Sequence, residues 1–591
     1  MLIASILPDE LVKGGMGKQV LYCPELEQIQ SSERKALFSQ AAAAVLVIED
    51  AIPDDILDAW LRAQHRHQPV ILANLPNEEL SRQCEARGIT LKFLEPQPYD
   101  CSPHLALLGM AEAEELQRQV APLWQSLGIG DGQHRSCGNV VCIGAGIVNL
   151  LTAYSLTEAG FTVELMDAGP PPQEGRTQHS PGATRVGENA RMFCFTEADT
   201  YHHKGDTTHA NMQSVFERPI AEGGWRVRCA GTEKPEYIRW CERFHQIPSW
   251  RSQLYARDLY HFNQRSGLLW GMMRERYPNL FENVGFRQGI IRCYAEKTAF
   301  EAAIAQQRQL GALRQIFSPE RLAIEHPALA PACLNGEIFG ALEVVGFTLN
   351  IHDFVAVLIH HLEKCGVTFH WHSRVVKFQR EGNVIVGLQL EDGSRRTADN
   401  YVVSPGAYGY ELLAETRSAS SLVGVAGLWM TLPNLEPALH RSMKIHREGD
   451  VGENSNVTLA RDASNQDILI LGSGYAAIGD QRQIDLNCPD IQALYAGLET
   501  TVRRFFPRQD ALGQGDGRKQ IIPRACIRPF TATGLGLFEA LPAASGLALI
   551  AGGHNTGGFT QGPVVAEAVT ATLKGEYHEM QLKYDPQRGI L

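Results

Sequence analysis

Short apolar runs alternate with amphipathic stretches in the first hundred residues, which is typical of strands joined by helices. The apolar runs Ala44–Ile48, Pro69–Ala73 and Ile89–Leu94 predict three strands. Helices are predicted over Asp54–His67 and Asn77–Arg87, with Gly88 as a stop signal. Strands separated by helices favour a small parallel α/β unit.

A second strand–helix–strand pattern follows a polar, glycine-rich segment, Leu127–Gly138, that we interpret as a linker. Asn139–Ile143 predicts a strand, Leu150–Ala159 a helix ending at Gly160, and Phe161–Met166 a second strand. A glycine-rich turn, residues 144–149, joins the first strand to the helix. This context is typical of a dinucleotide-binding βαβ unit.

Each residue of this turn has an expected task. Gly144 allows the tight turn, and Gly146 lets backbone N–H groups approach a pyrophosphate. Asp167 ends the second strand, roughly 20 residues on, where a carboxylate binds ribose hydroxyls and disfavours NADP. The third glycine of the usual pattern is replaced by Asn149, a departure from the fingerprint. The motif alone does not separate NAD from FAD.

A second glycine-rich turn lies near the C-terminus, over Gly552–Pro563. It follows the predicted strand Leu547–Ala551 and leads into a predicted helix, Val564–Leu573. Glycines followed by a proline at a helix start direct unpaired N–H groups and the positive end of the helix dipole at one point. We therefore expect this turn to face negative charge.

With these motifs, residues 139–575 resemble the FAD-dependent amine and amino-acid oxidoreductases of the D-amino-acid oxidase family, which includes glycine oxidase, sarcosine oxidase and D-amino-acid dehydrogenase. The resemblance implies a Rossmann-type FAD-binding domain with an interleaved α+β substrate domain. The preceding α/β unit loosely resembles a flavodoxin-like domain. The predicted divisions are 1–135 for this N-terminal α/β domain, 136–225, 346–420 and 521–591 for the FAD-binding domain, and 226–345 and 421–520 for the substrate domain.

The resemblance also implies site residues. In the glycine-oxidase branch the arginine matching Arg528 pairs with the substrate carboxylate, a role that suits a permanently charged, two-pronged guanidinium. Pro529 and Thr531 follow the family pattern, whereas Thr533 stands where an aspartate is usual. Thr560 occupies the position of a carboxylate-binding lysine in the sarcosine branch, which moves carboxylate binding towards Arg528. We predict Arg528 and Thr560 as catalytic residues.

The family pattern extends to the cofactor. Val375 and Val376 are expected on a strand that touches the adenine, Gly406 in a turn near the dinucleotide, and Arg185 in a loop over the flavin. The turn from Gly557 is expected at the flavin N1–C2=O edge. The full predicted cofactor set is Gly144, Gly146, Ile147, Val148, Asp167, Ala168, Arg185, Val375, Val376, Gly406, Gly557, Gly558, Phe559, Thr560 and Gln561.

The sequence leaves two alternatives for the flavin, covalent attachment and non-covalent binding. Cys526 matches the cysteine that sarcosine-oxidase-like members bond to the flavin, but its surroundings resemble the non-covalent branch more, and free cysteines are commonly buried as small apolar residues. We expect non-covalent FAD. Arg461 and Tyr475 flank predicted strands of the substrate domain, and ordinary structural roles are expected for both.

Composition limits the kinds of molecule that the chain is expected to bind. The chain of 591 residues carries 54 Lys and Arg against 66 Asp and Glu, a net charge of −12, which disfavours nucleic acid. The N-terminus lacks the basic and apolar regions of a secretory signal, and every apolar run is shorter than the ~20 residues of a membrane span. No C-x-x-C pair or zinc-type histidine spacing occurs. We expect a cytoplasmic enzyme without metal, as a homo-oligomer or with a partner subunit.

The predicted reaction is oxidation of the C–N bond of an amino acid or N-substituted amino acid to an imine, by hydride transfer to flavin N5. Three alternatives stay open from the sequence. One is a flavoprotein subunit of a hetero-oligomeric amine dehydrogenase, another is an FAD-dependent tRNA-modification enzyme, and the third is an NAD-dependent 2-hydroxyacid or opine dehydrogenase.

Overall fold

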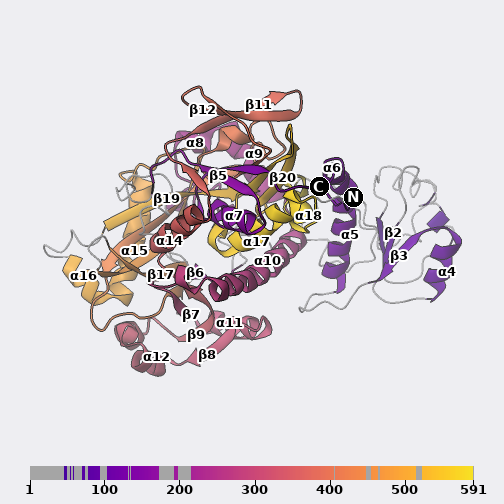
Figure 1. Cartoon of the computed structure of the whole chain (residues 1–591). Coiled ribbons are helices and arrows are strands. Elements are labelled where there is room, and N and C mark those ends of the chain that lie inside the picture. The colour runs from indigo at the N-terminus through magenta and orange to yellow at the C-terminus, as the bar shows by residue number, and fades with distance from the viewer. Residues whose placement is uncertain are drawn as a thin grey trace.

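The fold is described from a computed structural model (Figure 1). The described residues are 45–48, 54, 57–58, 61, 70–73, 78–93, 103–130, 132, 135–171, 192–197, 214–404, 406–447, 454–462, 466–513 and 522–589.

A small parallel sheet forms the N-terminal unit, as the alternating pattern predicts. Strands β1 (Val45–Ile48), β2 (Val70–Ala73) and β3 (Thr90–Phe93) pair in that order, with both pairings parallel. Helix α4 (Glu78–Ala86) leads into β3, and α5 (Pro103–Gln119) contacts β1 and β2. Most of the helix predicted over 54–67 lies outside the described residues. Figure 1 shows α5 between this unit and the rest of the chain.

A six-stranded sheet brings together segments that are far apart in the sequence. Its order is β10-β5-β4-β14-β21-β20, and all pairings are parallel except that of β20. The strands are β4 (Asn139–Ile143), β5 (Thr162–Met166), β10 (Thr368–His370), β14 (Asn400–Val403), β20 (Leu537–Pro542) and β21 (Leu547–Gly552). This is the predicted Rossmann-type sheet, and its central strands are buried because helices cover it.

A larger mixed sheet forms the second lobe. Its order is β19-β15-β18-β17-β16-β7-β9-β6, and β8 also pairs with β9. The strands are β6 (Met192–Phe193), β7 (Arg287–Tyr294), β8 (Leu313–Phe317), β9 (Gly340–Thr348), β15 (Leu422–Pro433), β16 (Met443–His446), β17 (Asn454–Arg461), β18 (Asp467–Gly479) and β19 (Ile522–Thr531). A separate antiparallel sheet contains β11 (Val375–Glu381), β12 (Val384–Leu390) and β13 (Arg395–Arg396).

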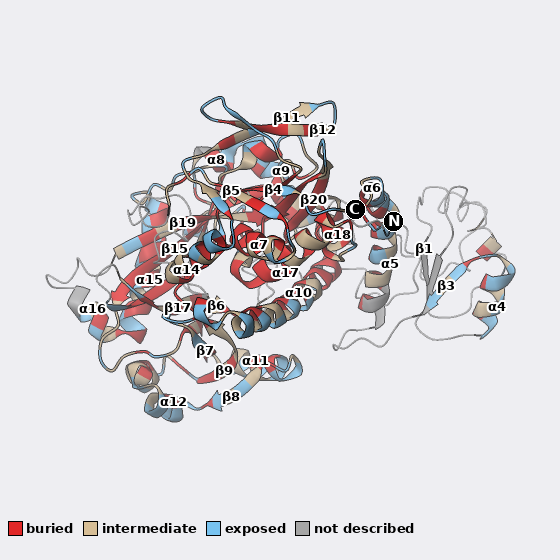
Figure 2. Ribbon diagram, viewed as in Figure 1, coloured by how far each residue is buried: buried red, intermediate tan, exposed pale blue. Residues whose placement is uncertain are grey.

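Helices cover the sheets. They are α6 (Ala121–Gln125), α7 (Ile147–Glu158), α8 (Ala230–Glu233), α9 (Pro235–Gln246), α10 (Ser249–Arg276), α11 (Lys297–Gln309), α12 (Pro319–Glu325), α13 (Ala330–Leu334), α14 (Ile351–Lys364), α15 (Pro489–Phe505), α16 (Pro507–Gly513), α17 (Gly558–Leu573) and α18 (Met580–Lys583). Figure 2 shows α7 and α17 as mostly buried and α12 as largely exposed.

Helices α7 and α17 pack against each other at the centre of the largest apolar core. Gly562 of α17 lies so close to α7 that an added Cβ would be 2.6 Å from Cδ1 of Leu151. The absence of a side chain there lets the two helix axes approach, and this approach brings their N-termini together.

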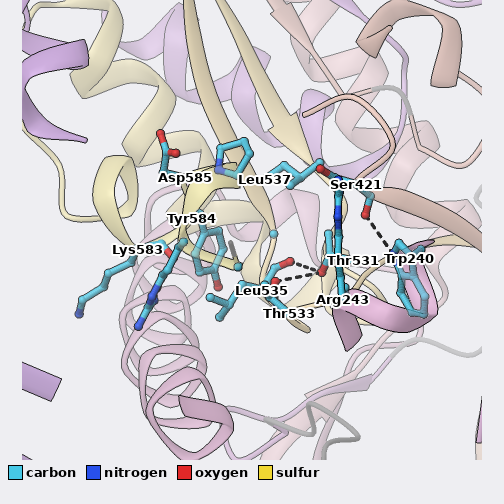
Figure 3. Close-up of a pocket in the computed structure, with 15 residues that line it drawn as sticks. Trp240, Arg243, Ser421, Thr531, Thr533, Leu535, Leu537, Lys583, Tyr584 and Asp585 are labelled. Carbon is cyan, nitrogen blue, oxygen red and sulfur yellow. Dashed lines mark hydrogen bonds between the residues drawn. The ribbon is translucent and has the colours of Figure 1, made fainter. Parts of the chain in front are cut away.

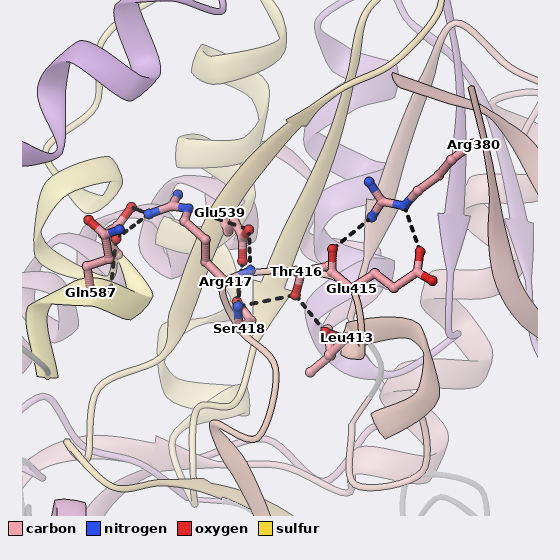
Figure 4. A network of polar contacts seen from close by, with 9 residues as sticks. Arg380, Leu413, Glu415, Thr416, Arg417, Ser418, Glu539 and Gln587 are labelled. Atoms are coloured by element: carbon pink, nitrogen blue, oxygen red, sulfur yellow. Dashed lines mark hydrogen bonds and ion pairs between the residues drawn. The ribbon is translucent and has the colours of Figure 1, made fainter. Parts of the chain in front are cut away.

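A buried carboxylate on β20 connects residues 417–418, which precede β15, to the six-stranded sheet (Figure 4). Glu539 of β20 accepts hydrogen bonds from the backbone N–H groups of Arg417 and Ser418, both at 2.9 Å, and from the Ser418 hydroxyl at 2.6 Å. The Arg417 guanidinium then donates to both oxygens of Asp585, at 2.7 and 2.8 Å. Buried polar groups satisfied in this way fix the C-terminal segment on the sheet.

A second group of buried ion pairs joins α5 to α10 and to the C-terminal segment. Glu112 of α5 lies 3.0 Å from Nε of Arg251 and accepts a 2.8 Å bond from Nη2 of Arg588, and all three side chains are at most 5% exposed. Arg588 also reaches Asp258 of α10 at 2.7 Å. The stacking of Trp124 on Phe538, with ring centroids 5.7 Å apart, extends this contact. The predicted domain boundaries stay a prediction.

Candidate functional site

The first glycine turn leads from β4 into α7 and has the geometry expected of a phosphate-binding turn. Gly144 has φ +98°, and an added Cβ would lie 2.8 Å from the Ser404 carbonyl oxygen, so only glycine fits there. Gly146 is exposed, and an added Cβ would meet nothing within 4 Å. Helix α7 begins at Ile147, three residues earlier than predicted, so the N–H groups of Ile147 and Val148 belong to its first turn.

Asn149, the departure from the fingerprint, ties this turn together. Its side-chain amide donates to the carbonyls of Ile143 at 2.8 Å and Gly144 at 2.9 Å, and the residue is fully buried. A third glycine would pack helix and strand closely, whereas Asn149 holds the same junction by hydrogen bonds.

Asp167 lies beside the turn at the end of β5. Its carboxylate accepts from the N–H groups of Ala145 at 2.6 Å and Gly169 at 2.7 Å. Its carbonyl accepts from the N–H of Ser373 at 2.8 Å, just before β11 begins at Val375. The start of β11, with Val375 and Val376, therefore follows two residues after a backbone contact with Asp167. Ala168 is exposed next to it.

The turn after β14 lies against the first glycine turn. The N–H of Ser404 donates to the Ile143 carbonyl at 3.2 Å, and Gly406 has φ +57° with open space at its Cβ position. The structure thus brings Gly406 to the same end of the sheet as Gly144.

The second glycine turn is adjacent to the first. A Cβ added to Gly558 would lie 3.7 Å from Cγ2 of Val148, so the N-termini of α17 and α7 meet. Helix α17 begins at Gly558, with Gly557 as its N-cap and Pro563 inside the helix. The prediction that Pro563 starts this helix is wrong, because the helix begins five residues earlier. The positive end of its dipole therefore lies at the glycine pair.

The first turn of α17 is buried. Phe559 packs against Trp270, with ring centroids 5.1 Å apart, and the Thr560 carbonyl accepts a hydrogen bond from the Ser266 hydroxyl of α10. Gln561 accepts a 2.7 Å hydrogen bond from the Tyr584 hydroxyl. These contacts fix Phe559, Thr560 and Gln561 beside the glycine pair.

His554 precedes this helix and is a buried histidine that the sequence reasoning did not single out. It is 5% exposed, and burial lowers its pKa to about 4, although the neighbouring Gln561 side chain acts in the opposite direction. The imidazole is therefore neutral at physiological pH. The motif around Gly553 is the sequence signal that could have identified it.

Arg528 lies on β19, at the edge of the large sheet next to the second turn. The carbonyl of the following residue, Pro529, accepts from the N–H of Asn555 at 3.1 Å. The guanidinium lies across Gly427 of β15, where an added Cβ would be 2.3 Å from Cζ. It also lies over the ring of Tyr475, with Cζ 5.6 Å from the centroid. Arg461, in contrast, is an exposed residue paired with Asp467.

Thr533 contributes to a local turn. Its hydroxyl donates to that of Thr531 at 3.4 Å and accepts from the N–H of Leu535 at 3.2 Å. The small cavity here, about 30 Å³, is lined by residues that include Trp240 and Tyr584 (Figure 3). Such a volume holds a few water molecules and no amino acid.

Cys526 is 8% exposed in an apolar cluster with Trp429, Ala460, Ile468 and Ile470. Arg185 lies outside the described residues. Within the described part of the chain, no group of three His, Cys, Asp or Glu side chains could hold a metal ion, and no helix is long and apolar enough to cross a bilayer.

The comparisons with known proteins identify the family. A family profile described as FAD dependent oxidoreductase (DAO) matches residues 139–572, which is well over half of the chain. The chain belongs to this family. It is therefore an FAD-dependent oxidoreductase, which sets aside the NAD-dependent alternative.

Relatives agree with this membership, and a solved structure has a similar fold. D-amino acid dehydrogenase 2 of Ralstonia nicotianae is 24% identical over 440 residues, covering 71% of this chain and 93% of that relative. D-amino acid dehydrogenase of Vibrio vulnificus is 23% identical over 301 residues, covering 50% of this chain and 67% of that relative. Fructosamine oxidase (Amadoriase II) of Aspergillus fumigatus has a TM-score of 0.50 at 14% identity, covering 77% of this chain and 91% of its own, a likeness of fold.

The residues of the two turns fit FAD. The open space at Gly146 leaves room for a pyrophosphate at the N-terminus of α7, and Asp167 offers a carboxylate at the expected ribose position. The N-terminus of α17 supplies a second group of N–H donors next to the first. Two adjacent donor groups suit a cofactor that carries negative charge at the pyrophosphate and, when reduced, on the flavin ring.

Proposed function

We propose that this oxidoreductase oxidises the C–N bond of an amino acid or N-substituted amino acid to an imine. The α-hydrogen leaves with its electron pair, the nitrogen loses a proton, and water later hydrolyses the imine to an oxo acid and an amine. Bound FAD supplies the two-electron acceptor for the hydride. The observation that carries the proposal is the Arg528 guanidinium on β19, one residue before Pro529, whose carbonyl accepts from the N–H of Asn555 in the second glycine turn.

Arg528 is proposed to bind and orient the substrate carboxylate. A guanidinium donates two parallel N–H groups to two carboxylate oxygens and keeps its charge at all working pH values. Its strand is tied to the second glycine turn through Pro529 and Asn555, and the Thr531 N–H donates to Oδ1 of Asn555 at 2.9 Å. Arg528 and the turn therefore form a rigid pair, which favours a fixed distance between carboxylate and flavin.

The cofactor is proposed to bind non-covalently. Gly144, Gly146, Ile147 and Val148 would face the pyrophosphate, and Asp167 the ribose. The apolar neighbours of Cys526 support a thiol that acts as a packing residue rather than as an attachment site. Gly557, Gly558 and the first turn of α17 would stabilise negative charge on the ring.

Thr560 is proposed as the second contact in the substrate site. It is 6% exposed, and its carbonyl is held by Ser266, so its backbone position is fixed by α10. A hydroxyl in that position can donate one hydrogen bond to a carboxylate without adding charge. Arg528 is then the charged partner of the substrate.

The test is steady-state kinetics of Arg528→Ala and Arg528→Lys on the amino acid that is turned over fastest in a panel. We expect Arg528→Ala to raise KM by roughly a hundredfold or more, because the charged hydrogen bonds are lost, while FAD stays bound. Arg528→Lys should recover part of the loss as a single point charge. Unchanged KM in both variants, with normal FAD content, would remove Arg528 from the site.

A further inference from the structure

The most informative feature beyond these residues is the group of side chains around the Arg528 guanidinium. Residue pairs across the sheet place Val425 opposite Arg528 and Gly427 opposite both Tyr475 and Cys526. The guanidinium extends from β19 over Gly427 of β15 to Tyr475 of β18. A charged side chain thus crosses a neighbouring strand at Gly427, a residue without a side chain.

Gly427 makes this crossing feasible. An added Cβ would lie 2.3 Å from Cζ and from Nη1 of Arg528, and 2.5 Å from Nη2. Glycine in the interior of a strand weakens it and commonly marks a close approach by another group. Here that group is the guanidinium, so Gly427 determines where Arg528 can lie.

The ring of Tyr475 lies against the guanidinium, beyond Gly427. The Arg528 Cζ is 5.6 Å from the centroid of the Tyr475 ring, within the range of a cation–π interaction. The ring is itself held by Trp225, with centroids 4.6 Å apart and planes inclined by 32°, and by Phe530, with centroids 6.2 Å apart.

The backbone keeps this aromatic pair in place. The Trp225 carbonyl accepts from the N–H of Ala477 at 2.6 Å, and the N–H of Val227 donates to the Ala477 carbonyl at 3.0 Å. The segment that carries Trp225 therefore adds to the edge of β18 two residues beyond Tyr475. These backbone hydrogen bonds anchor the Trp225 segment to the strand that carries Tyr475.

We propose that Tyr475, supported by Trp225, and Gly427 are positioning residues that fix the Arg528 guanidinium for the substrate carboxylate. The inference rests on the proposed function. A flexible arginine side chain would lose rotamer freedom on binding a carboxylate, and an arginine held in advance between a glycine and an aromatic ring has already lost it. The expected benefit is tighter binding of the carboxylate and not a faster chemical step.

The experiment compares Tyr475→Leu, which removes the ring, with Tyr475→Phe, which keeps it, in the FAD-loaded enzyme. We expect Tyr475→Leu to raise KM about tenfold, equivalent to about 1.4 kcal/mol, with kcat within about twofold. Tyr475→Phe should restore KM to within about twofold of the wild type. Binding of propionate, followed by the visible absorbance of the flavin, should weaken in parallel with KM.

Two further variants keep the test decisive. Gly427→Ala should raise KM as Arg528→Ala does, whereas Gly271→Ala in α10, where an added Cβ meets nothing within 4 Å, should behave as the wild type. Adding Tyr475→Leu to Arg528→Ala should change neither KM nor propionate binding further, because Tyr475 acts through Arg528.

The outcomes separate this inference from the proposed function. If Arg528→Ala leaves KM and propionate binding unchanged, the carboxylate site itself is misplaced. If Arg528→Ala has its expected effect while Tyr475→Leu and Gly427→Ala match the wild type, only the positioning role is overturned. An additional loss from Tyr475→Leu in the Arg528→Ala background would also overturn it.

Discussion

Gly558, the first residue of α17, lies against Val148 in the first turn of α7, with 3.7 Å between an added Cβ on Gly558 and Cγ2 of Val148. More than 400 residues separate the two positions along the chain. Their contact joins the two glycine turns into one surface of N–H donors. The proposed FAD site depends on this contact.

The two turns should respond differently to the same small substitution. Gly144→Ala places a methyl group 2.8 Å from the Ser404 carbonyl at a φ of +98°, so we expect loss of bound FAD and a cost of about 2 kcal/mol or more in folding free energy. Gly558→Ala meets only an ordinary contact with Val148, so its folding free energy should stay near that of the wild type. Urea unfolding compares the two variants, and FAD content per chain measures the loss in Gly144→Ala. Equal folding free energies in the two variants would contradict the assigned geometry.

Asn149 offers a test of the altered fingerprint. Asn149→Ala leaves two backbone carbonyls without their amide donor in a fully buried position, which should cost about 1–3 kcal/mol. FAD should dissociate more readily from the loosened turn, as measured by fluorescence on dilution. Asn149→Gly, which restores the usual third glycine, should not recover the affinity. If it did, the hydrogen bonds of Asn149 would have no special role.

His554 should make stability depend on pH. Its pKa is lowered to about 4 by burial, from an ordinary value of 6.5. Between these values the unfolded chain binds the proton and the folded chain does not, so stability should be complete above about pH 7 and fall as the pH drops toward 4, by at most about 3 kcal/mol.

Urea unfolding at pH 7.5 and pH 5 of the wild type and of His554→Asn measures this dependence. The variant should lose stability at both pH values but show less change between them. His360→Asn, at an exposed position on α14, serves as the control and should follow the wild type. An identical pH dependence in His554→Asn and the wild type would show that other groups are responsible.

Glu112 should anchor the N-terminal segment. Glu112→Gln removes the charge that faces the buried Arg251 and Arg588, and breaking a buried pair typically costs about 3–5 kcal/mol. We expect a lower Tm and faster proteolysis near α5. Glu115→Gln in the same helix should have little effect, since its partner Gln119 is at the surface. Equal Tm values for both variants would argue against a buried anchor.

Much of the fold follows from local signals in the sequence. The strand, glycine turn and helix from Asn139 to Glu158 were predictable because the apolar run is short and the glycines permit only one kind of turn. Helix starts were less predictable. Both α7 and α17 begin within their glycine turns, because tertiary contacts such as that between Gly562 and Leu151 outweigh the low helix propensity of glycine.

The candidate site was predictable only in part. Resemblance to the family drew attention to Arg528, but nothing local in the sequence relates it to Gly427 or Tyr475. Those residues meet through the pairing of β15 with β18 and β19, which is long-range information. The buried charges of Glu112 and Glu539 were missed for the same reason, since charge patterns alone do not distinguish a buried carboxylate from an exposed one.

The central claim is tested most directly by mixing the FAD-loaded enzyme, without oxygen, with amino acids and with the corresponding amines that lack the carboxylate. The fraction of flavin bleached in the visible spectrum is the measured quantity. We predict that one or more amino acids reduce the flavin rapidly, that their decarboxylated amines do so at least a hundredfold more slowly at equal concentration, and that Arg528→Ala removes this preference. Equal reduction by amino acids and amines in the wild type would contradict the account.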